Sequence, residues 1–233
     1  NEIEKRIHDF FADIKMPAVA REKQNCRIAH DRENRFLVQG HNFNKPLELV
    51  IYFKQEGKPK RTYKDFKEAI IGQLYNEIVS SRADNNSSQT NNKNFSRRSS
   101  YYEHLFPFGL REISGLKFSS SVATLNNAAE FETGLKAGLR EMEQVRRYGF
   151  KQTELEYAKE KMLKKWNVPE LYLRSSYQIR AFRDHYLFDD AVPAPDYHYD
   201  LVERIVKELT LSEVNEAVKG WLNSSYTDIT ILY

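Results

Sequence analysis

The sequence has little cysteine and lacks long hydrophobic runs. Cys26 is the only cysteine among 233 residues, which excludes an internal disulfide framework and a zinc site built from several thiolates. One thiol does not distinguish the cytoplasm from an extracytoplasmic compartment. No run approaches the roughly 18 apolar residues of a membrane-spanning helix, and the first residues do not resemble a signal peptide. We therefore expect no membrane span, and we interpret the opening without Met as a boundary within a longer protein.

The short motifs of common catalytic sites are also missing. Neither H-E-x-x-H nor H-x-x-E-H occurs, and neither do the glycine-rich phosphate loops or the G-x-S-x-G turn of serine hydrolases. Residues 30–34 and 100–104 each contain half of a zinc motif. Both segments lie where a turn or strand is expected, and there the motif's spacing would not bring two zinc ligands to the same face. We interpret His30 and His104 as surface residues and Cys26 as an ordinary thiol. The sequence thus predicts no catalytic and no metal-binding residue.

Charge of one sign is not in excess. The 36 basic and 33 acidic residues leave a net charge of +3, and the charges alternate along expected helices, so nucleic acid is a poor candidate partner. What the sequence does contain is aromatic and aliphatic residues, with 40% hydrophobic content, 14 Phe and 14 Tyr. This content is sufficient for one large core, and we predict a single domain over residues 1–233.

Hydrophobic periodicity predicts an α+β order of elements. Apolar spacing indicates helices at residues 3–14, 62–82, 127–148, 171–187, 195–209 and 211–222, and a capping-box pattern at 153–156 indicates the start of another helix. Strands are indicated at 35–39, 47–53, 101–108, 115–125 and 226–233 by β-branched or aromatic runs. Residues 83–100 are almost wholly polar and predict a mobile loop. Strands around one long helix, followed by consecutive helices, favour a sheet with helices packed on one face.

Two groups of side chains are candidates for peptide binding. Arg97, Arg98, Tyr101 and Tyr102 adjoin the polar segment, and Arg and Tyr commonly anchor peptide contacts, although a solvated loop edge is the simpler interpretation. A second group of aromatic residues falls along one expected helix and its exit. Such a stripe is typical of core and less often lines a groove. The residues of this stripe are Tyr172, Tyr177, Phe182, Tyr186 and Phe188.

One segment carries a family resemblance. Residues 139–159, with Gly149-Phe150 and then Thr153-Glu154-Leu155-Glu156-Tyr157-Ala158-Lys159, resemble the "helix, G-F/I-T, x-x-E-L, x-x-A-K" segment of pitrilysin/insulinase-family zinc metallopeptidases, except that Lys151-Gln152 is inserted. The opening helix with its Met16-Pro17 exit and the segment from residue 209 to the end are similar to the family's start and ending. The similarity covers nearly the whole chain and is greatest to the second domain of long bacterial members.

The resemblance implies a two-layer, mainly antiparallel sheet with helices on one face, as in the processing-peptidase-like domains. It implies that zinc is held by another domain of a longer parent chain, and that this domain holds none and helps to enclose peptide substrate. Family members that cleave peptides use an Arg and, seven residues on, a Tyr to hold substrate. Here Arg82 has Gln89 at that offset, so the pair is not carried over.

Two other interpretations remain open. The chain is an assembly domain if its parent has lost peptidase activity, and an H-x-x-E-H motif elsewhere in the parent would distinguish the two cases. It is an unrelated α+β peptide-binding module if the Glu-Leu, Ala-Lys segment matches by chance, in which case the family's sheet would be absent.

Overall fold

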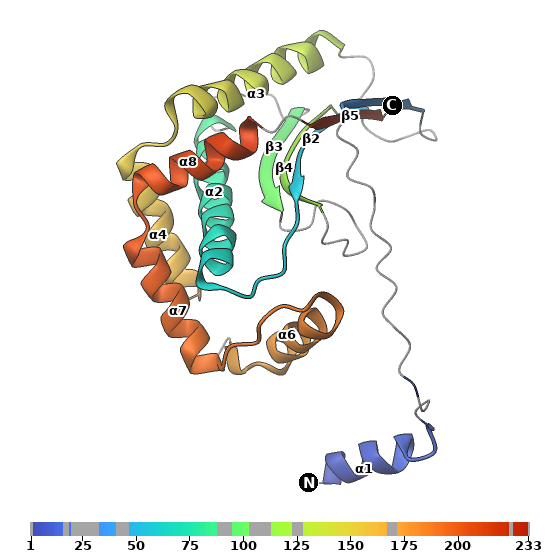
Figure 1. Cartoon of the computed structure of the whole chain (residues 1–233). Coiled ribbons are helices and arrows are strands. Elements are labelled where there is room, and N and C mark those ends of the chain that lie inside the picture. The colour runs from blue at the N-terminus through green and yellow to red at the C-terminus, as the bar shows by residue number, and fades with distance from the viewer. Residues whose placement is uncertain are drawn as a thin grey trace.

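The structure is a computed structural model of the chain, and it describes residues 2–15, 19, 33–40, 47–87, 95–102, 113–122, 128–166, 172–223 and 226–232. Figure 1 shows helices gathered along one side of a sheet. The strands are β1 (Arg35–Gln39), β2 (Leu47–Glu56), β3 (Phe95–Tyr102), β4 (Ile113–Val122) and β5 (Thr227–Leu232). The helices are α1 (Glu2–Phe11), α2 (Tyr63–Ser87), α3 (Ala128–Tyr148), α4 (Gln152–Trp166), α6 (Ser175–Phe188), α7 (Pro195–Glu208) and α8 (Leu211–Leu222).

The five strands form one sheet in the order β1-β5-β2-β4-β3. Strand β5 pairs with β2 antiparallel and with β1 parallel, and the other pairs are antiparallel. Strands from both ends of the chain therefore share one sheet. The predicted α+β class with a mainly antiparallel sheet is confirmed.

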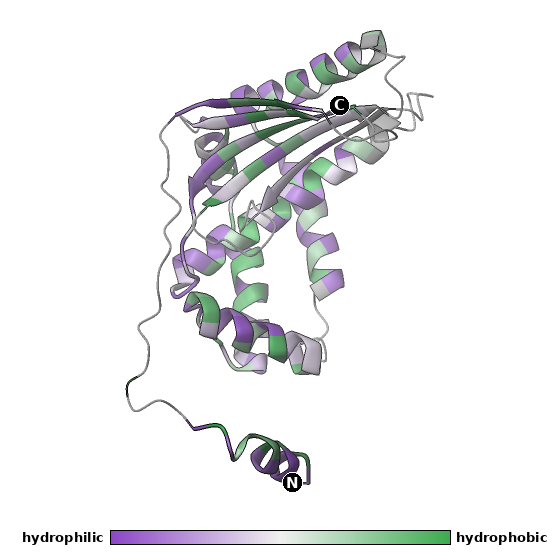
Figure 2. Cartoon of the chain, turned by 90° about the vertical axis from the view of Figure 1, so that its right-hand side faces the viewer, coloured by the Kyte–Doolittle hydropathy of each residue, from purple (hydrophilic) through white to green (hydrophobic). Residues whose placement is uncertain are grey.

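The core lies between one sheet face and helices α2, α3 and α8. Alternate residues of the central strands point to these helices because successive side chains of a strand point to opposite faces. Helices α4 and α7 pack on α2 farther from the sheet (Figure 1). The fully buried residues that join these layers include Leu74, Leu116, Phe118, Leu155, Ile205 and Val214. Figure 2 shows hydrophobic and hydrophilic residues alternating along the strands. The face opposite the helices is nevertheless covered in part, because Val50, Lys54 and Ile113 point to it and are buried.

Several helix boundaries follow from local signals in the sequence. Helix α8 begins with a capping box in which Thr210 accepts a hydrogen bond from the Glu213 amide and Glu213 bonds the Thr210 amide. Thr62 and Asp65 make the corresponding contacts at the start of α2. The helix predicted to start at Thr153 begins at Gln152, and its first turn is capped by the Glu154 carboxylate, which accepts from the Lys151 amide, in place of the predicted Thr153 box.

The polar segment differs from the prediction at both of its ends. A loop was predicted over residues 83–100, but α2 continues through Ser87 and β3 begins at Phe95. Of the strand predicted at 101–108, residues 101 and 102 form the end of β3, and the others lie outside the described residues. The reason is that β3 obtains its backbone hydrogen bonds by pairing with β4, so its Ser- and Arg-rich sequence needs no strong strand propensity. Residues 88–94 and 103–112 lie outside the described residues.

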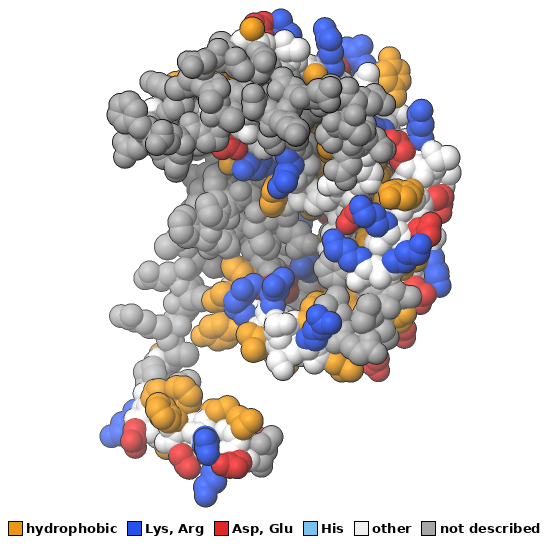
Figure 3. Space-filling model, turned by 180° about the vertical axis from the view of Figure 1, so that it is seen from behind, with side chains coloured by type: hydrophobic (Ala, Val, Ile, Leu, Met, Phe, Trp, Pro, Cys, Tyr) orange, Lys and Arg blue, Asp and Glu red, His pale blue; other side chains and the backbone are white. Residues whose placement is uncertain are grey.

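The apolar stripe predicted for the first helix is present but exposed. No residue of α1 is buried, and Figure 3 shows its hydrophobic side chains on the surface of the molecule. Strand β1 is exposed along its whole length as well. The exposed apolar side chains of these two elements are Ile3, Ile7, Phe10, Phe11, Phe36, Leu37 and Val38. Within the described residues, none of the helices has the length and hydrophobicity needed to cross a bilayer.

Candidate functional site

The predicted peptide contacts fall on β3, which is an edge strand of the sheet. Consecutive residues of a strand point to opposite faces, so Tyr101 and Tyr102 cannot lie on the same surface. Tyr101 is 8% exposed and faces the helices, whereas Tyr102 is 38% exposed and lies on the other face. Arg98 is exposed and shares the face of Tyr102. Arg97 pairs with Ser120 through the backbone, and its side chain lies outside the described residues.

Tyr101 was expected to be exposed, but it is part of the core. Its ring stacks on the Trp221 ring with centroids 4.2 Å apart and the planes 24° from parallel. On its other side the ring lies directly over Gly72 of α2, so closely that a Cβ at this position would overlap it. The glycine is therefore required for the close approach of α2 to β3. We interpret Tyr101 as a residue that positions β3, and Tyr102 and Arg98 as its candidate contacts with a ligand.

The outer edge of β3 is occupied at Tyr101 by a side chain from α2. The Asn76 amide accepts a hydrogen bond from the Tyr101 N–H at 2.6 Å and donates one to the Tyr101 carbonyl at 3.0 Å. One side-chain amide thus makes the two contacts that a neighbouring strand would make. Exposed strand edges pair readily with other chains, and this contact closes the edge at one position.

The sheet face opposite the helices, which we term the outer sheet face, carries a row of polar side chains across all five strands. Arg35 pairs with Asp228, Asp228 with Tyr52, Tyr52 with Lys117, and Lys117 with Ser100. Residues paired in this way share a face. Lys117 Nζ lies 5.9 Å from the centre of the Tyr52 ring, within the range of a cation–π contact. The row therefore alternates charged and hydrogen-bonding groups from one edge of the sheet to the other.

Two further features shape the outer sheet face near Tyr102. Tyr102 pairs with Gly115, and Gly115 pairs with Lys54; both Gly115 and Lys54 are buried, whereas Tyr102 is exposed. Buried Lys54 forms an ion pair with Asp228 at 2.8 Å. Burial, followed by the negative charges of Glu48 and Asp228, raises the pKa of Tyr52. Tyr52 therefore stays protonated and can donate a hydrogen bond over the physiological pH range.

The remaining sequence candidates have other environments. Arg82 makes two hydrogen bonds to the Glu154 carboxylate at 2.6 and 2.8 Å, which lower the pKa of Glu154, and its guanidinium lies over the Phe150 ring. Arg82 is thus a packing residue of the α2–α4 contact. His30, His104 and Cys26 lie outside the described residues. Among the described residues, no group of three or more His, Cys, Asp and Glu is arranged to hold a metal ion, so this part of the chain offers no zinc site.

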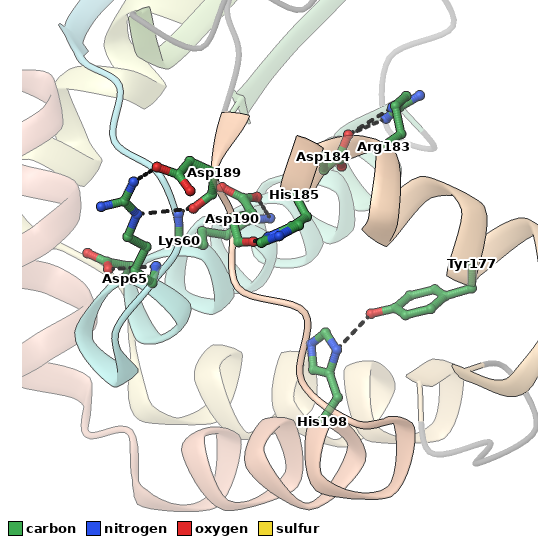
Figure 4. A network of polar contacts seen from close by, with 10 residues as sticks. Lys60, Asp65, Tyr177, Arg183, Asp184, His185, Asp189, Asp190 and His198 are labelled. Atoms are coloured by element: carbon green, nitrogen blue, oxygen red, sulfur yellow. Dashed lines mark hydrogen bonds and ion pairs between the residues drawn. The ribbon is translucent and has the colours of Figure 1, made fainter. Parts of the chain in front are cut away.

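The aromatic stripe was interpreted as core, and this was wrong for two of its five residues. Phe182 and Tyr186 of α6 are 60% and 77% exposed, although Tyr172 is fully buried. Helix α6 has no buried residue, so its aromatic side chains do not enter the core. Tyr177 points toward His198 of α7 across the space between these helices, with its hydroxyl 3.0 Å from His198 Nδ1 (Figure 4).

His198 lies among the rings of Phe66 and Tyr172, with centroids 5.5 and 5.0 Å away. Burial, and then the positive charge of Lys60, lower the pKa of His198 to about 4 from its ordinary 6.5. The imidazole is therefore neutral at neutral pH, and sequence analysis did not single it out. A lone His between charged and aromatic residues gives no recognisable signal before the helices are placed.

This environment predicts a pH dependence of stability. Because the folded state binds the His198 proton less tightly than the unfolded state, stability is fully present above pH 6.5 and is lost as the pH falls toward 4. We expect a loss of roughly 1 kcal/mol between pH 7 and pH 5 after allowance for partial exposure. Urea denaturation at both pH values measures it. The loss should disappear in His198→Gln and persist in the exposed control His8→Gln.

Measurement between pH 7 and pH 5 separates the contribution of His198 to stability from that of the carboxylates. Lys67 and the Thr210 amide lower the pKa of Glu213 to about 2, so its contribution is lost only below its ordinary value of 4.5. A loss of stability between pH 7 and pH 5 that is equal in the wild type and His198→Gln would contradict the assignment to His198.

Comparison of the structure with known proteins identifies its fold. An insulinase-family protease from Yersinia pestis superimposes with a TM-score of 0.74 at 15% identity, covering 99% of this chain. The periplasmic protease PqqL from Escherichia coli gives 0.74 at 16% identity, covering all of this chain. This chain has the fold of the insulinase-family peptidases. The same fold occurs in the inactive domain of a peptidase M16 from Pseudomonas fluorescens, with a TM-score of 0.59, 15% identity and 86% of this chain covered.

This chain spans less than half of the length of each of these three matched proteins. This chain covers 48% of the Yersinia protease, 25% of PqqL and 43% of the Pseudomonas domain structure. No family model and no curated protein matches the sequence. The relationship is therefore visible in the arrangement of strands and helices, while the sequence similarity is low.

Proposed function

We propose that this chain is a non-catalytic domain of a zinc-dependent endopeptidase and forms part of the wall that encloses the peptide substrate. The insulinase-type fold and the absence of a zinc motif from the sequence support this role. Zinc is expected in another domain of the parent, where it would activate the attacking water.

The outer sheet face is the observation that carries the proposal. This face carries the row of polar side chains from Arg35 to Ser100, with the exposed Tyr102 and Arg98 beside it. Tyr and Arg give large contact areas and directional hydrogen bonds without fixing a particular peptide sequence. Such a surface suits a chamber that must accept many peptides.

The exposed apolar side chains of α1 and β1 support contact with other domains of the parent. Exposed apolar surface on two consecutive elements is typical of an interface. We propose that Phe10 and Phe11 of α1 and Phe36 to Val38 of β1 are covered by a neighbouring domain of the same chain. The partial coverage of the matching chains fits this arrangement.

The deciding experiment compares this chain with its full-length parent. We expect the isolated chain to contain no stoichiometric zinc and to leave a quenched mixed-peptide substrate uncleaved, while the parent is inhibited by a chelator. Within the parent, Arg98→Gln with Tyr102→Ala should raise KM about 3- to 10-fold with little change in kcat, because weak ground-state contacts are lost.

Arg140→Gln is the control, since Arg140 is exposed and belongs to α3, which packs on the sheet face opposite to that of Arg98 and Tyr102. Cleavage or stoichiometric zinc in the isolated chain would overturn the non-catalytic assignment. An inactive parent without zinc would instead favour an assembly domain. If the parent is active and its KM does not change when Arg98 and Tyr102 are replaced, β3 is not part of the chamber wall.

A further inference from the structure

A cavity of about 480 Å³ lies among the helices of the domain, and no residue of β3 lines it. Helices α2, α6 and α7 surround it, and the segments that precede α2 and α7 close one end. Its volume is within the range of sites that bind small ligands or single side chains, about 300 to 1,000 Å³. Figure 4 shows part of its rim, where Tyr177 and His198 face each other from α6 and α7.

One wall of the cavity is apolar and aromatic. Phe66 of α2 and Tyr172 both pack against the His198 ring, and Ile70 and Val202 extend this wall. The Tyr172 and Tyr177 rings are also in edge contact, with centroids 5.0 Å apart. Because the rings hold one another, the wall is formed before any ligand arrives. A flat aromatic or branched apolar group fits such a surface best.

Among the described residues that line the cavity, the charged side chains other than Arg180 are paired, including Asp184 with Arg183 at 2.7 Å. Lys60 contacts Asp190 at 3.7 Å, and Lys165 contacts Glu77 at 3.3 Å. Arg180 of α6 also lines the cavity, and within the described part of the chain it makes no hydrogen bond or ion pair. An unpaired guanidinium next to an apolar wall favours a carboxylate, which it can bind through two parallel hydrogen bonds.

Neutral hydrogen-bonding groups lie between the apolar wall and Arg180. Gln73 and Ser176 line the cavity, and their side chains have no partner among the described residues. Gln178 donates its amide to the Tyr172 carbonyl, which leaves its side-chain oxygen as an acceptor. These amide and hydroxyl groups match the donors and acceptors of a peptide bond. A simple aromatic acid would leave them unused.

We propose that this cavity binds the carboxyl-terminal residue of a peptide, with an aromatic or large apolar side chain against the Phe66 and Tyr172 wall and the carboxylate on Arg180. Gln73, Ser176 and Gln178 then contact the last peptide bonds. The proposal does not rest on the chamber-wall role, because the cavity lies on the helical side and its test is equilibrium binding by this chain alone.

The test measures binding of three probes by isothermal titration calorimetry. These are N-acetyl-Ala-Ala-Phe with a free carboxylate, the same peptide as its carboxyl amide, and 3-phenylpropionate. For a ligand of this size we expect a Kd of about 0.1 to 1 mM for the acid peptide. The amide should bind about 10-fold more weakly, because it loses a charge-assisted contact, and 3-phenylpropionate should also bind about 10-fold more weakly, because it lacks peptide bonds.

Two variants locate the site. Arg180→Gln should weaken the acid peptide about 10-fold and leave the amide unchanged, so that the two probes become equal. Ala181→Phe, which places a ring in the cavity, should abolish binding of both. Arg174→Gln is the matched control, since Arg174 is exposed at the start of the same helix and does not line the cavity. Circular dichroism establishes that each variant is folded.

Each other outcome overturns the proposal. Equal binding of acid and amide by the wild type, or an Arg180→Gln effect equal for both probes, removes the carboxylate contact. Binding of 3-phenylpropionate as tight as that of the peptide identifies a small aromatic acid as the ligand. Binding that survives Ala181→Phe places the site elsewhere, and absence of binding at 10-fold above the expected Kd, about 10 mM, removes the site altogether.

Discussion

Replacing Tyr101 by alanine is expected to lower the free energy of unfolding by about 3 to 5 kcal/mol, the usual cost of removing a buried aromatic ring. The ring is 8% exposed and stacks on Trp221, so its loss leaves a cavity between β3, α2 and α8. This is a large part of the 5 to 15 kcal/mol that typically stabilises a domain. Urea denaturation followed by circular dichroism measures the change.

The contact between Tyr101 and Gly72 allows a double-mutant cycle. Gly72→Ala alone should destabilise the domain by about 1 to 3 kcal/mol, because the added methyl group overlaps the ring. In the Tyr101→Ala background the same change should be neutral or stabilising, since the space is open and alanine favours a helix over glycine by about 1 kcal/mol. Additive effects of the two changes would show that the ring does not determine the glycine.

Replacing Asn76 by leucine should cost about 2 to 4 kcal/mol, because it leaves the Tyr101 N–H and carbonyl without partners. Asn76→Asp should cost less than Asn76→Leu, since the carboxylate still accepts a hydrogen bond from the Tyr101 N–H. It should still destabilise the domain, because the carboxylate faces the Tyr101 carbonyl oxygen. We also expect Asn76→Leu to increase self-association, because the edge of β3 is then open to pairing. Urea denaturation and light scattering measure the two effects.

Ser80→Ala is the control for Asn76, since Ser80 lies one turn farther along α2 and is exposed. Its expected effect on stability is within about 0.5 kcal/mol. If Asn76→Leu changed stability no more than Ser80→Ala, the amide would not be a necessary partner of β3, and water would satisfy the strand edge.

The helices were predictable from the sequence because their signals are local. Thr210 and Glu213 are three residues apart, and together they fix the start of α8 without any information from the rest of the fold. Gly149 similarly ends α3 by adopting a φ of 69°, which residues other than glycine rarely adopt. The strands at residues 35–39 and 47–53 were recognised by composition alone.

The candidate site was less predictable because it depends on contacts between distant segments. The burial of Tyr101 is determined by Gly72 and Asn76 of α2 and by Trp221 of α8, and no pattern around residue 101 contains that information. Propensity also failed for β3, whose polar sequence is held as a strand by pairing with β4. The row on the outer sheet face combines single residues from five strands, so it emerges only once the register is known.

The position of β5 constrains the order in which the domain can be assembled during synthesis. This strand is the last in the sequence, yet it lies between β1 and β2 and is the strand with which β1 pairs. Strands β2, β3 and β4 can pair before residue 227 leaves the ribosome. Until then β1 lacks the strand with which it pairs, and one edge of β2 is unpaired. Slow translation or cleavage before β5 would therefore yield a three-stranded intermediate prone to aggregation.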